Sequence, residues 1–158
     1  MKQWMKKIGA LLFAGSLTAC LLAGCAKEVV LDVDKLAEEL RNTVAFTDDI
    51  TKIDDSGMSM LYKELDTSKV EKSAVYASSG ASTEEIGVFE AKTKDDVQAV
   101  KDAVQKRIDA QIEGYSDYGP DQVPRLNDVV LETAGKYVIF VASDHNDQAK
   151  TVIEKYTK

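Results

Sequence analysis

The cysteine at position 25 is the residue whose neighbours most clearly imply a chemical modification. It follows a basic start and an apolar run, and Leu22, Ala23 and Gly24 stand directly before it. This is the pattern of a lipobox, in which the precursor is cut before the cysteine and the thiol receives a diacylglycerol. One acyl chain holds a protein only marginally at a membrane, whereas two hold it stably. We therefore expect Cys25 to be the lipid attachment site of an exported protein.

Residues 1–24 have the three-part layout of a secretory signal peptide. Lysines come first, an apolar run from Ile8 to Leu22 follows, and small residues close it. The run is shorter than the roughly 20 residues that a spanning helix needs. An uncleaved membrane anchor and ordinary cleavage that leaves Cys25 free are the alternatives. Cys20 lies within the removed segment, so the mature chain has no pair of cysteines for an internal disulfide and no free thiol for catalysis.

Cleavage before Cys25 leaves 134 residues, which suits one domain with a core of its own. The removed segment carries three lysines and no acid, so the formal net charge changes from −7 to −10. An acidic surface argues against nucleic acid as a partner and against close contact with anionic lipid. Residues 25–30 form a short lipidated tether, and we expect any partner to lie near the membrane surface.

Four aspartates precede a glycine in the stretch from Thr47 to Gly57, which raises the question of a calcium loop. They are Asp48, Asp49, Asp54 and Asp55. Hard cations bind several oxygens on a bent backbone. If Gly57 took the turn position of an EF-hand, however, Lys52 and Lys63 would occupy the first and last ligand positions. We expect a solvated loop here, with a calcium-stabilised surface module as the weaker alternative.

The single histidine, His145, is the residue that a serine–histidine–acid triad would have to use. No Gly-x-Ser-x-Gly elbow accompanies it. Acidic residues are abundant, but abundance does not indicate a glycosidase pair, and no zinc, phosphate-loop or dinucleotide pattern is present. We expect a non-enzymatic protein without a cofactor. An envelope hydrolase or esterase, associated with cell-surface polysaccharide, is the alternative.

The most distinctive polar stretch runs from Tyr115 to Pro124 and contains both prolines of the chain. Aromatic and acidic side chains on a proline-stiffened loop can bind a ligand. Arginine and tyrosine are also favoured in tight interfaces. We expect a binding surface formed by Arg107, Tyr115, Tyr118 and Asp121. The alternative is that the tyrosines pack against the sheet while Pro120 ends a helix.

The apolar periodicity predicts a single α+β domain over residues 31–158. A helix starts at Asp32, and a short buried helix lies around Met58. Two β-hairpins follow, each with a helix after it, in the order ββαββα. Their strands are 69–78 with 83–91 and 126–133 with 136–143, the first helix runs from Thr93 to about Gly114, and Asp144 caps the last. We expect a four-stranded antiparallel sheet with the helices on one face, preceded by the N-terminal helix.

Several stretches resemble one family of small bacterial lipoproteins. They are Thr83-Glu84-Glu85-Ile86, Arg107, Tyr118 to Pro124 and Gly135 to Val138. The family is the domain of unknown function 4358, and the resemblance extends over most of residues 30–157. It implies a lipid-anchored protein on the extracytoplasmic face of a Gram-positive-type membrane, with no established activity. Together with the residues, it favours a binding or accessory domain whose partner is an envelope protein or a glycan.

Overall fold

The computed structural model describes residues 29–158, so the predicted signal peptide and lipid attachment site lie outside the described residues. The elements in chain order are α1 (Val33–Thr43), β1 (Thr51–Ile53), α2 (Asp55–Leu61), η1 (Thr67–Lys69), β2 (Val70–Ala77), β3 (Glu85–Ala91), η2 (Lys94–Asp96), α3 (Val97–Tyr118), η3 (Pro120–Gln122), α4 (Val123–Asn127), β4 (Val130–Ala134), β5 (Tyr137–Ala142) and α5 (Asn146–Thr157). None of the helices in this range combines the length and the apolar character needed to cross a membrane.

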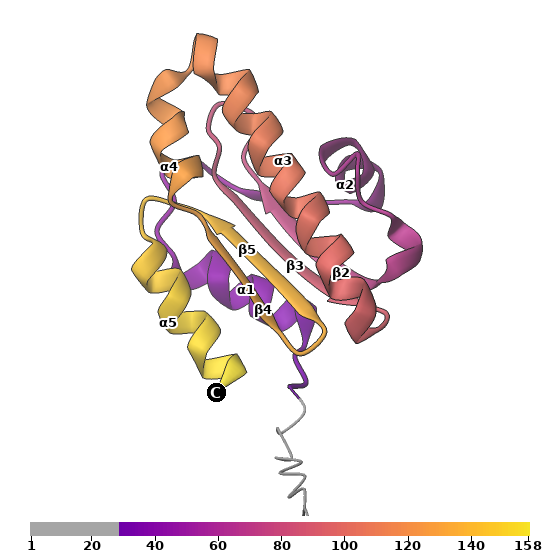
Figure 1. Ribbon diagram of the computed structural model, residues 1–158. Coiled ribbons are helices and arrows are strands. Elements are labelled where there is room, and N and C mark those ends of the chain that lie inside the picture. Colours follow the sequence, from indigo (N-terminus) through magenta and orange to yellow (C-terminus); the bar gives the residue numbers. More distant parts are fainter. Residues whose placement is uncertain (1–28) are drawn as a thin grey trace, which may run out of the picture.

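The strands form one antiparallel sheet in the order β1-β2-β3-β5-β4 (Figure 1). The prediction of an α+β fold is confirmed, but the prediction of four strands is wrong, since β1 adds a fifth. β1 lies in the stretch expected to be a solvated loop, where Thr51 pairs with Ala77 and Ile53 with Val75. A three-residue edge strand is too short to show an alternating pattern. Its extended form depends on its pairing with β2.

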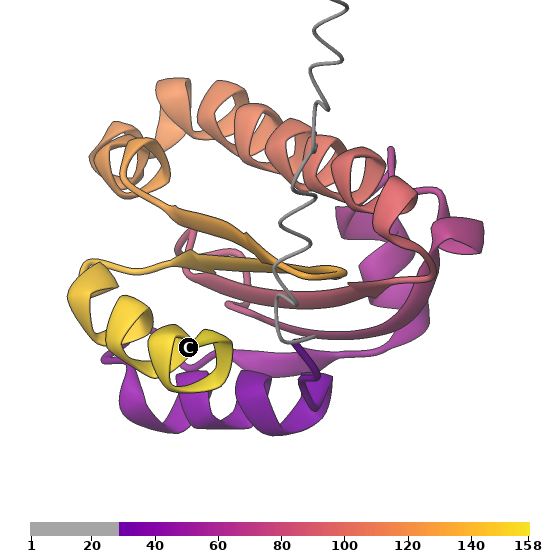
Figure 2. The same cartoon turned by 60° about the horizontal axis from the view of Figure 1, so that its bottom comes forward.

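Helices cover both faces of the sheet, so the expectation that they gather on one face is wrong (Figure 2). α1 and α5 pack on one side, and α2 and α3 pack on the other. The reason is visible in β5, whose alternate residues enter different cores. Ile139 and Val141 join the α1/α5 core, whereas Val138 and Phe140 join the α3 core. A strand that is apolar on both faces needs cover on both.

The N-terminal helix forms as the periodicity predicts. The side chain of Asp32 caps it by accepting a hydrogen bond from the backbone N–H of Lys35. Val33, Leu36 and Leu40 recur at helical spacing and are buried against the sheet. α1 therefore closes the sheet face that α5 shares.

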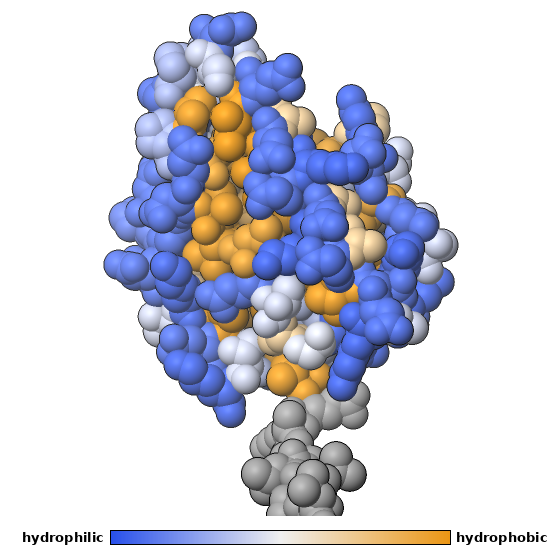
Figure 3. All heavy atoms as spheres, viewed as in Figure 1, coloured by the Kyte–Doolittle hydropathy of each residue, from blue (hydrophilic) through white to orange (hydrophobic). Residues whose placement is uncertain are grey.

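The stretch from Tyr115 to Pro124 is helical, not a loop. α3 continues through Gly114 to Tyr118, and η3 and α4 follow with a break at Gly119. Pro120 stands at the first position of η3, where a missing N–H costs little. Leu126, expected in a strand, is buried in α4, so the second hairpin begins only at Val130. Apolar side chains are exposed on both sides of α3 (Figure 3).

Asp144 does not cap the last helix as predicted. The N-cap position is His145, without a capping side-chain hydrogen bond, because the carboxylate of Asp144 binds Arg125. Thr93 also makes no capping hydrogen bond to the backbone, because its Oγ1 donates directly to Asp96 Oδ2 at 2.6 Å. In both places a side-chain partner takes the hydrogen bond that a cap would have made to the backbone.

Gly87 and Gly114 are expected to respond oppositely to alanine. A Cβ at Gly87 would lie 2.7 Å from Phe89 Cε2 and 3.0 Å from Tyr62 Oη, so Gly87→Ala should destabilise by about 1–3 kcal/mol. A Cβ at Gly114 meets nothing within 4 Å, and alanine favours a helix, so Gly114→Ala should stabilise by up to about 1 kcal/mol. Urea unfolding of both variants measures the difference. Equal effects would contradict this packing.

Candidate functional site

A cavity of ≈ 470 Å³ opens between α2, the β2–β3 turn and α3. Its size is within the range of small-molecule sites. The predicted residues Arg107, Tyr115 and Tyr118 all line it. The other lining residues come from α2 and neighbouring Ile53 (Ile53, Gly57, Met60, Leu61), from the turn and the strands that flank it (Ala77, Ser78, Ser79, Gly80, Ser82, Glu84, Glu85) and from α3 (Gln111).

The polar floor of the cavity is built around the carboxylate of Glu85, which is only 1% exposed. Arg107 Nη2 donates to Glu85 Oε2 at 2.9 Å, and Gln111 Nε2 donates to the same oxygen at 3.3 Å. Tyr62 Oη donates to Glu85 Oε1 at 2.5 Å. Burial raises the pKa of Tyr62 well above its usual range, and the charge of Glu85 raises it further, so Tyr62 stays a neutral donor.

Glu85 enters this cavity because it stands at the start of a buried strand. Successive strand residues point to opposite faces, so Glu85 shares its face with Gly87 and Phe89. Gly87 leaves room for the ring of Tyr62, which meets Phe89 edge-on with ring centroids 5.1 Å apart. The neighbouring acid, Glu84, belongs to a separate cluster of hydrogen bonds toward α1 and α4.

Two polar atoms in this floor have no hydrogen-bond partner among residues 29–158. They are Arg107 Nε, a donor, and Gln111 Oε1, an acceptor. Gln111 is only 6% exposed, and the two residues stand one helical turn apart on α3. Buried polar groups in proteins are normally hydrogen-bonded. A ligand in the cavity can supply what these two atoms lack.

The rim of the cavity is aromatic and apolar. Tyr115 is buried, and its hydroxyl lies 2.9 Å from the carbonyl oxygen of Gly80 and 3.1 Å from that of Ser82, so it fixes the β2–β3 turn. Burial raises the pKa of Tyr115, which keeps this hydroxyl protonated. Tyr118 is 71% exposed and packs on Tyr115 with ring centroids 4.8 Å apart. Met60, 66% exposed, lines the cavity from α2.

The fourth predicted residue, Asp121, is not part of this cavity. It is exposed on η3, where it accepts a hydrogen bond from Gln122 Nε2. Sequence reasoning missed Glu85, Gln111 and Met60 as site residues. A signal for Gln111 was present, because Arg107, Gln111, Tyr115 and Tyr118 follow the 3–4 spacing of a single helix face.

The β2–β3 turn, which lines the cavity, lies at the end of the sheet opposite to the start of the described chain (Figure 1). Val29 contacts the β4–β5 turn at Gly135. In the antiparallel register, that turn is beside the Glu90 end of β3, whereas Glu85 pairs with Ala142 at the other end. The length of β3 therefore separates the cavity from Val29.

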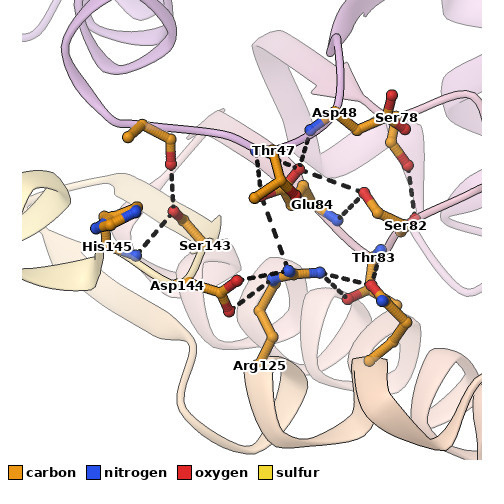
Figure 4. Close-up of polar contacts among 12 residues, drawn as sticks. Thr47, Asp48, Ser78, Ser82, Thr83, Glu84, Arg125, Ser143, Asp144 and His145 are labelled. Carbon is orange, nitrogen blue, oxygen red and sulfur yellow. Dashed lines mark hydrogen bonds and ion pairs between the residues drawn. The ribbon is translucent and has the colours of Figure 1, made fainter.

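A second polar cluster ties the chain after α1 to the sheet (Figure 4). The buried carboxylate of Glu84 accepts hydrogen bonds from the backbone N–H groups of Thr47 and Asp48 at 2.8–3.0 Å and from Ser82 Oγ at 3.4 Å. Arg125 lies 3.9 Å from Glu84 and binds Asp144 through two nitrogens at 3.0 and 2.7 Å. The guanidinium group lowers the pKa of Asp144, so this pair stays charged near neutral pH.

The cluster occupies the groups that a triad around His145 would use. Ser143 Oγ donates to the carbonyl of Ala45 at 2.9 Å and accepts from the backbone N–H of His145 (Figure 4). Asp144 is engaged by Arg125, on the other side of the serine from the imidazole ring. The serine and the acid are therefore both engaged by partners other than the histidine side chain.

The four aspartates of the predicted acidic loop do not converge. Asp48 and Asp49 precede β1, while Asp54 and Asp55 follow it. Asp54 caps α2 by accepting from the backbone N–H of Gly57. Within residues 29–158, no three histidine, cysteine or acidic side chains are grouped so that they could hold a metal ion.

The chain matches one known protein family. The domain of unknown function 4358 matches residues 42–143. The chain belongs to this family. The matched range contains all five strands and the whole cavity, and it is narrower than the resemblance predicted, since most of α1 and all of α5 lie outside it. No curated protein and no solved structure matches the chain.

Proposed function

We propose that this protein is a membrane-anchored extracytoplasmic lipoprotein whose folded domain is a non-enzymatic binding or accessory module of the cell envelope. The observation that carries the proposal is the cavity between α2 and α3. It gathers Arg107, Tyr115 and Tyr118 around a buried carboxylate and leaves two buried polar atoms without partners. Concave sites with an apolar rim and a few convergent polar groups are typical of ligand binding.

The position of the cavity relative to the proposed anchor indicates on which side of the domain a partner would bind. The proposed anchor at Cys25 precedes Val29, which lies beside the β4–β5 turn at the other end of the sheet from the cavity. A lipid held by that short tether keeps the Gly135 end of the domain near the membrane. The cavity then faces outward, toward the rest of the envelope. A partner on the outer side fits this arrangement better than one near the membrane surface, where the short tether led us to expect it.

Two features favour binding over catalysis. The only histidine lies outside the cavity, and its neighbours Ser143 and Asp144 are engaged by other groups. In the cavity itself, the carboxylate of Glu85 is held by three donors, including Arg107. Both oxygens of this carboxylate therefore already accept hydrogen bonds from protein side chains.

Site-specific crosslinking on intact cells tests the proposal. Tyr118 is replaced by the photo-reactive residue p-benzoylphenylalanine, and the same residue at Lys150, exposed on α5, serves as the matched control. We expect a recurrent protein or glycan adduct from position 118 and none from position 150. The adduct should disappear in the Cys25→Ser variant, which lacks the proposed anchor.

Two results would contradict the proposal. One is an adduct pattern that is the same at positions 118 and 150, since it would show random collision rather than a site. The other is a cell-surface protein, confirmed by antibody, that gives no adduct from position 118.

A further inference from the structure

A buried ion pair in the floor of the cavity restricts the charge of its ligand. The carboxylate of Glu85 is paired with Arg107 at 2.9 Å. Tyr62 is neutral because its pKa is raised, and Gln111 carries no charge. An anionic ligand would approach the buried Glu85, and a cationic ligand would compete with Arg107 for it. Separating a buried ion pair leaves one charge uncompensated, so an uncharged ligand fits this floor best.

The unpartnered atoms specify the ligand's polar chemistry. Arg107 Nε can only donate, and Gln111 Oε1 can only accept. A hydroxyl group both donates and accepts through one atom. A peptide amide offers the same capacities only from two separate atoms. Two groups of opposite kind, from residues one helical turn apart, therefore favour a hydroxyl.

The walls specify a ligand with an apolar face. The ring of Tyr118 is mostly exposed and packs on Tyr115 at an interplanar angle of 36°. Met60 lines the same cavity from α2, and the β2–β3 turn adds the hydroxyls of Ser78, Ser79 and Ser82. An aromatic surface beside a polar floor suits molecules with one apolar face and one hydrogen-bonding edge. A pyranose ring has this division, with C–H groups on its face and hydroxyls on its edge.

Building on the proposed function, we propose that the cavity binds an uncharged sugar unit. The ring face stacks on Tyr118, and one hydroxyl donates to Gln111 Oε1 while accepting from Arg107 Nε. The serines of the β2–β3 turn contact the outer hydroxyls. The source of the sugar is an envelope glycan, since the cavity faces away from the proposed tether.

The test measures sugar binding by the full chain in phosphatidylglycerol vesicles. The probes are the neutral disaccharides N,N′-diacetylchitobiose, cellobiose and maltose, with N-acetyl-trialanine amide as an uncharged peptide of comparable size. Saturation-transfer NMR reports which probe contacts the protein. We expect at least one disaccharide, and not the peptide, to bind at millimolar concentration.

Variants test whether the saturation-transfer signal comes from binding in the cavity. Tyr118→Ala should weaken the sugar by about tenfold or more, whereas Tyr118→Phe, which keeps the ring, should stay within about threefold. Gln111→Leu removes the acceptor and should also weaken binding, while Lys150→Ala on α5 should not. Thermal unfolding checks that each variant is folded. If Gln111→Leu does not fold, the exposed Tyr118 carries the test alone.

The outcomes separate this inference from the proposed function. If the peptide binds and no sugar does, the proposal of a sugar ligand is wrong. A binding module for protein segments would then remain. Binding of no probe up to about 10 mM, an affinity too weak for a built site, would also overturn it, even if crosslinking captured a partner. A sugar signal unchanged by Tyr118→Ala would place the sugar elsewhere.

Discussion

Replacing Glu84 by alanine is expected to destabilise the fold by about 2–4 kcal/mol, which lowers the unfolding midpoint by roughly 5–20 °C. The side chain is buried and accepts hydrogen bonds from the backbone of Thr47 and Asp48. Without the carboxylate these donors lose their partner, and Arg125 loses the buried one of its two acids, at 3.9 Å, while Asp144 remains at 2.7 Å. Differential scanning calorimetry of the full chain measures the change.

The matched control is Glu113→Ala, which removes a glutamate from the exposed side of α3. It should change the free energy of unfolding by no more than about 0.5 kcal/mol. Glu84→Gln should fall between the two, because the amide keeps one acceptor but turns an NH₂ group toward donors. A midpoint for Glu84→Ala that equals the control would mean that the segment after α1 holds its place without this carboxylate.

The sequence predicted well those elements in which the spacing of nearby apolar residues indicates the buried face. Val33, Leu36 and Leu40 mark one face of α1, and the helix forms where they recur. The two hairpins were also predicted, with their turns at Gly80 and Gly135, both of which have positive φ. Periodicity and turn chemistry act over a few residues, so a single chain carries these signals in full.

What the sequence did not predict depends on contacts between distant segments. The edge strand β1 is extended because it pairs with Val75 to Ala77, which are more than twenty residues away. The continuous apolar character of β5 implied cover on both faces, yet which helix covers which face depends on the connections between elements. The carboxylate of Asp144 likewise prefers Arg125 of α4 to the helix end beside it.

The cavity also depends on contacts between distant segments, which the sequence did not predict. Arg107, Tyr115 and Tyr118 were chosen for their residue types, and they meet because α3 is longer than predicted. Treating Tyr115 to Pro124 as a loop concealed the helical spacing that would have added Gln111. From the sequence alone, Glu85 could be recognised only as an acidic residue at the start of an apolar strand. Its partner Tyr62 comes from the end of α2, and no local pattern relates the two.

Replacing Cys25 by serine is expected to abolish lipid attachment completely. The thioether needs a thiol, and a serine hydroxyl is a far weaker nucleophile than a thiolate. Cells grown with an alkyne-tagged fatty acid should label the wild-type protein, and the label in Cys25→Ser should fall to background. Each acyl CH₂ group contributes about 0.8 kcal/mol to membrane binding, so loss of both chains removes the anchor as a whole.

The second cysteine provides the control for this experiment. Cys20 lies inside the apolar run that precedes the lipobox, so Cys20→Ser should keep the full label. Mass spectrometry of the mature wild-type protein should find its first residue at Cys25. An unlabelled wild-type chain that begins elsewhere would indicate ordinary signal cleavage, and one that retains residues 1–24 would indicate an uncleaved anchor. In the first case the outward-facing cavity would belong to a protein released from the membrane, and in the second the longer leader would let the domain reach partners farther away.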